Sequence, residues 1–247
     1  MIIYLMKGRD AMIKTVSWFA YFWLYQIALL GSLLKMKLLE LKGRNELVRN
    51  YTNKVAKAWA KSLVDFTGSE VIVKGKERLP DEPVLFVANH QGSFDIPLLL
   101  GYINKPIAFI AKWELRYMPF ISSWMKNMEC IFIKRNDFRQ TLRAFKDAGR
   151  VFEAGQSLVI FPEGTRSCSN KLGDFKRGSL KIALRENIPV VPITIKGSYK
   201  LREANGGLIK GDRVELIIGE TIYVDKLSKE EKDDLTLIVR EKIKDNL

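Results

Sequence analysis

The sequence has little cysteine and almost no histidine. Its 247 residues include two cysteines, Cys130 and Cys168, and a single histidine, His90. Two thiols cannot form the several bridges of a disulfide scaffold, and three such side chains fall short of the four ligands of a structural Cys/His zinc site. This cysteine usage fits a reducing, cytoplasmic environment.

Internal repeats, low-complexity tracts and an obvious linker between domains are also missing. Disorder is excluded because hydrophobic residues make up 47% of the chain and aromatic residues 11%, which is ample apolar surface to bury. The length suits one domain, or one domain with an appendage, and is sufficient for a full α/β core.

Acidic residues are scarce in the first quarter of the chain. Residues 1–64 hold 11 Lys and Arg but three Asp and Glu, so this quarter carries +8 of the formal net charge of +13. A basic block of this kind binds nucleic acid, an anionic membrane or an acidic protein. The sequence around this basic block is needed to distinguish between these three kinds of partner.

Residues 15–34 contain no charged side chain and six aromatic ones. Twenty such residues in a helix reach about 30 Å, the thickness of the hydrocarbon of a bilayer. Lysine and arginine flank the segment on both sides, so we expect both of its ends to face the cytoplasm, with the helix entering the membrane without crossing it. The alternative is a buried core helix.

Residues 45–64 repeat apolar side chains at helical spacing, and lysine and arginine fill much of the remainder. Such a basic amphipathic helix can lie on a membrane surface, or it can dock on the protein with its basic face in solvent. Next to the apolar segment we favour the membrane, and we predict a two-helix anchor linked around residues 42–45. The predicted division is an anchor over residues 1–64 and an α/β domain over residues 65–247.

From residue 70 onward short β-rich runs alternate with helical patterns. Strands are expected at 71–74, 84–88, 107–111, 129–133, 158–161, 190–195 and 214–223. Helices are expected at 96–102, 139–154, 178–186 and 228–246, the last opened by a capping box of Ser228 and Glu231. The sequence therefore predicts an α/β fold with a mostly parallel or mixed sheet flanked by helices.

The first candidate site is the segment NHQGSFD, residues 89–95, directly after a predicted strand. Ligand sites of open α/β sheets lie beyond the carboxyl ends of the strands. Asp95 returns one helical turn after His90, so its carboxylate could accept a hydrogen bond from one ring nitrogen and leave the other as a base. The H-x-x-x-x-D spacing alone also fits a loop histidine beside a helix cap.

The second candidate is FPEGTRS, residues 161–167, after another predicted strand. Gly164 lets the backbone turn, and Arg166 offers a planar fork of donors suited to phosphate. The downstream FKRG adds Lys176 and Arg177 just before the expected helix 178–186. An ordinary solvated turn is the alternative. Lys112 and Arg135, each at a strand end, are weaker candidates by themselves.

In combination, the blocks NHQGSFD, FIKR, FPEGTRS and VPITI resemble those of the glycerolipid acyltransferase family, and within it the bacterial branch that acylates lysophosphatidic acid. The resemblance covers roughly residues 70–220. It implies transfer of a fatty acyl group from a thioester of acyl carrier protein or coenzyme A to a glycerol hydroxyl. The basic flanks of residues 15–34 predict that the protein lies at the cytoplasmic face of the cell membrane. The resemblance also implies His90 as general base and Asp95 as its orienting partner.

The same resemblance implies residues that bind substrate, most of them around the acceptor phosphate: Lys112, Arg135, Glu163, Gly164, Thr165 and Arg166. The chain departs from the family pattern in two places. Gly92 stands where serine is common, and Glu129 and Cys130 precede an apolar pair that often follows glycine.

The chemistry agrees with these residues. A thioester is already activated, so a base that titrates near neutrality is sufficient, and no nucleophilic side chain, metal or cofactor is required. Glycerol 3-phosphate or another lysophospholipid is an alternative acceptor. A non-catalytic protein that binds membrane or nucleic acid through its basic block is the other alternative. The aromatics lie in an uncharged stretch that suits lipid better, so we expect an anionic phospholipid membrane as partner and no nucleic acid.

Overall fold

The structure, a computed structural model, describes residues 2–134 and 138–247. The strands are β1 (Glu70–Lys74), β2 (Leu85–Ala88), β3 (Ile107–Lys112), β4 (Ile131–Ile133), β5 (Ser157–Ile160), β6 (Val190–Lys196) and β7 (Arg213–Ile218). The α-helices are α1 (Ile2–Ala28), α2 (Leu30–Leu41), α3 (Asn45–Asp65), α4 (Asp95–Tyr102), α5 (Ile121–Asn127), α6 (Phe138–Glu153), α7 (Lys181–Glu186) and α8 (Lys229–Lys244).

The strands form one sheet in the order β1-β7-β6-β2-β5-β3-β4. The β6–β7 pair is antiparallel and the other pairs are parallel, which confirms the predicted mixed, mostly parallel sheet. Every residue of the central strands β2 and β5 is buried, as expected of strands covered on both faces.

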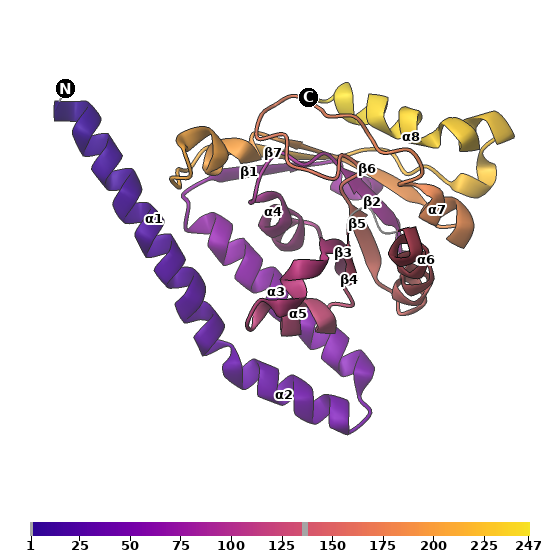
Figure 1. The fold of residues 1–247 in the computed structure, drawn as a ribbon, viewed down its shortest axis with the longest axis horizontal. Coiled ribbons are helices and arrows are strands. Elements are labelled where there is room, and N and C mark those ends of the chain that lie inside the picture. Colours follow the sequence, from indigo (N-terminus) through magenta and orange to yellow (C-terminus); the bar gives the residue numbers. More distant parts are fainter. Residues whose placement is uncertain (1, 135–137) are drawn as a thin grey trace.

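Helices cover both faces of the sheet. Figure 1 shows α3, α4 and α5 below the sheet and α8 above it. The predicted capping box at the start of α8 is confirmed: the Ser228 side chain accepts from the Glu231 amide, and the Glu231 side chain accepts from the Ser228 amide.

Most predicted elements are confirmed within three residues at each end. The strand expected over 214–223 ends earlier, at Ile218, and Ile222 then makes an isolated antiparallel bridge with Val190. The strand expected from 129 begins at Ile131, because Glu129 has a positive φ of 59° that breaks the extended backbone. The short helix α5 was not predicted.

The N-terminal helices form the expected hairpin, with a longer first arm. Figure 1 shows α1 and α2 running outside the domain and α3 returning beneath the sheet. The first arm of the hairpin consists of α1 and α2, and it includes the basic residues on both sides of residues 15–34. The stretch Arg9–Leu41 is long and apolar enough to cross a membrane, and 11% of its most apolar window is buried.

α3 differs from its expected place on a membrane surface. Its apolar face packs on α4 and α5 and lies in the main core, with Ala56, Ala60, Leu63 and Val64 all buried. The membrane interpretation of this helix is therefore wrong for its apolar face, because that face is covered by protein. An apolar stripe at helical spacing cannot distinguish these two surroundings. The division of the chain after residue 64 stays a prediction.

Candidate functional site

His90 and Asp95 meet at the carboxyl end of β2. His90 follows the last residues of the strand, and Asp95 is the first residue of α4. The ring Nδ1 of His90 lies 2.7 Å from Oδ2 of Asp95, whose side chain is fully buried, whereas that of His90 is 18% exposed. Since a carboxylate oxygen accepts, Nδ1 donates and Nε2 carries the free lone pair.

Asp95 is fixed by three further donors. Its Oδ2 also accepts from the amides of Gln91 (2.7 Å) and Gly92 (2.9 Å), and its Oδ1 accepts from the hydroxyl of Ser198. The ring of His90 stacks on Phe161 from the second turn, with 4.1 Å between ring centroids. The imidazole is therefore held from below by a carboxylate and along one face by an aromatic ring.

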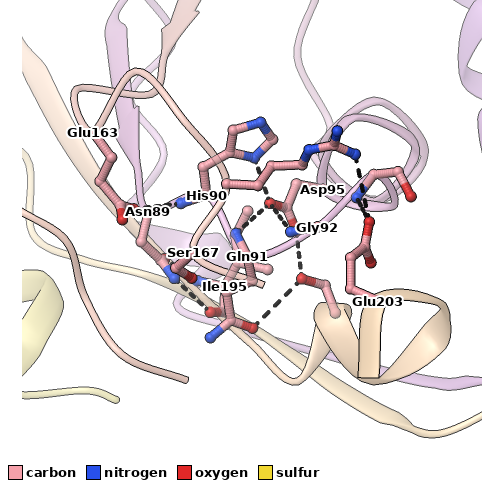
Figure 2. A network of polar contacts seen from close by, with 12 residues as sticks. Asn89, His90, Gln91, Gly92, Asp95, Glu163, Ser167, Ile195 and Glu203 are labelled. Carbon is pink, nitrogen blue, oxygen red and sulfur yellow. Dashed lines mark hydrogen bonds and ion pairs between the residues drawn. The ribbon is translucent and has the colours of Figure 1, made fainter. Parts of the chain in front are cut away.

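The segment 161–167 lies beside the histidine, as β5 neighbours β2 in the sheet. The amide of Ser167 donates to the carbonyl of His90 (2.8 Å), and that of Cys168 donates to the carbonyl of Gln91 (3.1 Å). Gly164 has a φ of +69°, a conformation that glycine adopts without steric cost. The structure thus joins the two motif segments into one site, drawn in Figure 2.

Glu163 points into this junction rather than into solvent. Its Oε1 accepts from the amide of His90 (2.7 Å) and its Oε2 from the amide of Gly173 (2.9 Å), and the residue is buried. Burial raises the pKa of this carboxyl, and the two amide donors oppose the rise. A buried carboxylate repels phosphate, so the position indicates support of the turn, and a role of Glu163 in binding substrate stays a prediction.

Thr165 and Arg166 are exposed at the tip of the turn. Arg166 Nη1 lies 3.5 Å from Oε1 of Glu203. Lys176 lies beside Gly164, where an added Cβ would come within 2.8 Å of the lysine Nζ. Thr165 also lines a pocket of about 290 Å³ next to the turn. The turn that follows Phe161 therefore has two cations beside it, Arg166 and Lys176, and such groups suit an anionic ligand.

Lys112 and Arg135 are less closely tied to this centre. Lys112 ends β3, which β5 separates from β2. Its side chain is 52% exposed and lies 3.3 Å from Glu114. Arg135 lies outside the described residues. Substrate binding by either residue stays a prediction.

Several supporting side chains were not among the predicted site residues. Asn89 exchanges two hydrogen bonds with the backbone of Ile195, and Gln91 accepts from the amide of Gly197 at 2.8 Å. Ser198 and Glu203 approach the first turn from the chain after β6. Asn89 and Gln91 stood inside a recognised motif, which was a usable signal. Ser198 and Glu203 lie outside every motif, so no pattern in the sequence points to them.

Comparison with known proteins agrees with this geometry. The acyltransferase family model matches residues 70–196. A probable 1-acyl-sn-glycerol-3-phosphate acyltransferase of Mycoplasma pneumoniae is 36% identical over 162 residues, which are 64% of this chain and 60% of that protein. The chloroplastic 1-acyl-sn-glycerol-3-phosphate acyltransferase BAT2 of Brassica napus is 35% identical over 181 residues, 72% of this chain and 52% of that protein.

The chain thus spans between half and three fifths of the length of these two relatives. Among solved structures, the 1-acyl-sn-glycerophosphate acyltransferase of Thermotoga maritima superposes with a TM-score of 0.78 at 31% identity, covering 96% of this chain and 95% of that one. The family model covers more than half of the chain and includes both motif turns. This chain belongs to the acyltransferase family.

Proposed function

We propose that the protein transfers a fatty acyl group from a thioester to the sn-2 hydroxyl of lysophosphatidic acid and so makes phosphatidic acid. The observation that carries this proposal is the hydrogen-bonded His90–Asp95 pair beside the exposed Arg166 turn. A base and an anion-binding group at one sheet edge suit an acceptor that has both a hydroxyl and a phosphate. The relatives, named as 1-acylglycerol-3-phosphate acyltransferases, support the same acceptor.

In this mechanism Nε2 of His90 accepts the proton of the acceptor hydroxyl as the oxygen attacks the thioester carbonyl. The new C–O bond forms and the C–S bond breaks. The imidazolium then gives its proton to the departing thiolate, which restores the base. Asp95 stabilises the transient imidazolium and holds the ring, which is the usual contribution of a buried carboxylate beside a catalytic histidine.

The thioester oxygen needs hydrogen-bond donors while charge builds on it. The amides of Gln91 and Gly92 already donate to Asp95, and that of Ser93 donates to Glu203. The first turn is therefore a poor source of such donors. We place them in the backbone that follows Gly164, where the chain turns beside the imidazole.

The acceptor phosphate is proposed to bind at Arg166, with Lys176 as a nearby second cation. In this proposal the phosphate site also includes Gly164 and Thr165 of the turn, together with the basic residues Lys112 and Arg135. The donor is an acyl carrier protein or a coenzyme A thioester, and the chemistry requires no cofactor because the acyl group arrives activated.

The membrane anchor is proposed to be the exposed apolar side of α1 and α2. Their outer face carries large apolar side chains that are more than a third exposed: Met12, Ile13, Val16, Phe19, Trp23, Leu24, Ile27, Leu30, Leu34, Leu38 and Leu41. An apolar face of this length is not left to water in a soluble protein. With basic residues at both ends, we propose that this face enters the cytoplasmic leaflet of an anionic membrane, as the monotopic or re-entrant first arm of the helical hairpin.

The test offers lysophosphatidic acid, glycerol 3-phosphate and lysophosphatidylcholine to the detergent-purified protein, each with acyl carrier protein and coenzyme A thioesters. We expect turnover with lysophosphatidic acid, and its loss in His90→Ala at an unchanged melting temperature. Turnover with glycerol 3-phosphate and with neither lysophospholipid would mean that glycerol 3-phosphate is the acceptor. Salt-dependent DNA binding without acyl transfer, or full activity in His90→Ala, would contradict the proposal.

A further inference from the structure

Glu203 bridges the two motif turns from a third part of the chain. It opens the 3-10 helix η4 (Glu203–Asn205), in the segment that follows β6. Its Oε1 accepts from the amide of Ser93 (2.8 Å) and lies 3.5 Å from Arg166 Nη1, and its side chain is 11% exposed. Figure 2 shows Glu203 reaching toward the turn that holds Gly92.

The space for this carboxylate comes from the missing side chain at Gly92. A Cβ at that position would lie 2.5 Å from Glu203 Oε2 and 3.0 Å from its Cδ, closer than packed atoms come. Glycine at position 92 is one of the two departures from the family pattern, in which serine is common. The departure at 92 and the carboxylate of Glu203 therefore form one local arrangement of this chain.

Arg166 gains a fixed counter-charge from this arrangement. Its side chain is 47% exposed, so much of the guanidinium faces solvent. A free arginine side chain loses rotamer entropy when it is ordered by a ligand. Because the Ser93 amide already fixes Glu203 Oε1, that carboxylate can order one end of the guanidinium beforehand.

We propose that Glu203 is a positioning residue that orients Arg166 toward the phosphate of the acceptor. This inference rests on the proposed function for the identity of the acceptor. Glu203 acts through Arg166 and touches no reacting atom. Its loss should weaken acceptor binding and leave the chemical step in place.

The first test is a double-mutant cycle on the full chain in detergent. Glu203→Gln keeps an oxygen for the Ser93 amide and removes the charge that faces Arg166. We expect the KM for lysophosphatidic acid to rise about two- to fivefold, the range of a partly exposed ion pair. We expect kcat and the donor KM to change by less than about twofold. In an Arg166→Ala background, Glu203→Gln should change nothing further.

The matched control is Glu220→Gln, which removes one exposed carboxylate elsewhere and should leave all constants unchanged. Equal effects of Glu203→Gln with and without Arg166 would overturn the inference, because Glu203 would then act on its own. A lower KM would overturn it too, since the carboxylate would then compete with the phosphate. A loss of kcat alone would also overturn it, because Glu203 would then support the turn around His90 and not Arg166.

The second test does not depend on turnover. Phenylglyoxal modifies free guanidinium groups, and peptide mass spectrometry reports the rate at Arg166. We expect this rate to rise at least about twofold in Glu203→Gln and to stay unchanged in Glu220→Gln. Lysophosphatidic acid alone, without donor, should protect Arg166 more strongly in the wild type than in Glu203→Gln. If the wild type fails to acylate lysophosphatidic acid, the proposed function fails, but an unchanged labelling rate would separately overturn this inference.

Discussion

Asp95→Asn isolates the charge of the buried carboxylate from its shape. If the asparagine oxygen takes the place of Oδ2, it still accepts from Nδ1 of His90 and from the amides of Gln91 and Gly92. The asparagine Nδ2 then faces Ser198, whose hydroxyl can turn and accept. We therefore expect the fold and the ring orientation to survive, and the imidazolium of the transition state to lose its counter-charge.

The magnitude follows from two bounds. A hydrogen bond to a charged group is worth about 1.5–3 kcal/mol and a neutral one about 0.5–1.5, so the middles of the two ranges differ by about 1.3 kcal/mol, or roughly tenfold. Two charges about 4 Å apart attract by about 4 kcal/mol at an effective dielectric constant of 20, which gives on the order of 1000-fold. The fully buried Asp95 favours the upper part of this range. We expect kcat to fall about 10- to 1000-fold.

The assay measures kcat with both substrates saturating, together with the melting temperature of the purified variant. A melting temperature close to that of the wild type shows that the hydrogen bonds around Asp95 are kept. A kcat within threefold of the wild type would refute the reasoning, because the carboxylate would then add nothing to the histidine. A loss of kcat larger than that of His90→Ala would also refute it, since Asp95 acts here through that ring.

Three further predictions concern the acceptor, the anchor and the thiols. Arg166→Ala should raise the KM for lysophosphatidic acid about tenfold, with partial rescue by Arg166→Lys, whereas a rise in the donor KM alone would reverse the two substrate sites. In a Cys168→Ser background, single cysteines at Met1 and Lys37 should react with an impermeant thiol reagent on the same side of sealed vesicles, and opposite sides would mean a spanning helix. Burial raises the pKa of Cys130 from 9.0 to about 12, so iodoacetamide at pH 8 should modify the exposed Cys168 and reach Cys130 after unfolding. Equal rates in the folded protein would contradict that burial.

The contact between His90 and Asp95 was predictable because its rule is local. A histidine at a strand exit and an aspartate in the next helical turn lie five residues apart, and the fold of that short segment brings them together. Ser198 and Glu203 follow no such rule, because they are more than 100 residues from Asp95 and Ser93, which they contact in the first turn. The pairing of β6 with β2 brings them to the carboxyl end of β2, and no spacing in the sequence specifies that pairing.

The N-terminal helices show a different limit. Apolar residues at helical spacing on α3 and the uncharged run on α1 both fit a membrane by composition, yet the structure buries one and exposes the other. The side chain of Trp18 illustrates how the boundary is set: its Nε1 donates to the carbonyl of Leu63 at 2.9 Å, and its ring lies 5.4 Å from that of Phe94. Such contacts depend on which surfaces the domain offers, which the pattern of one helix does not contain.

Strand order explains why the site stands where it does. β2 lies between β5 and β6, so its end receives the Arg166 turn from one neighbour and the segment with Ser198 from the other. Asn89 fixes the second junction through its two hydrogen bonds with Ile195, immediately before His90. Since side chains alternate between the faces of a strand, a shift of β2 by one residue would turn both His90 and its neighbours away from their partners. The buried apolar register of the three central strands therefore holds the charges of the site in place.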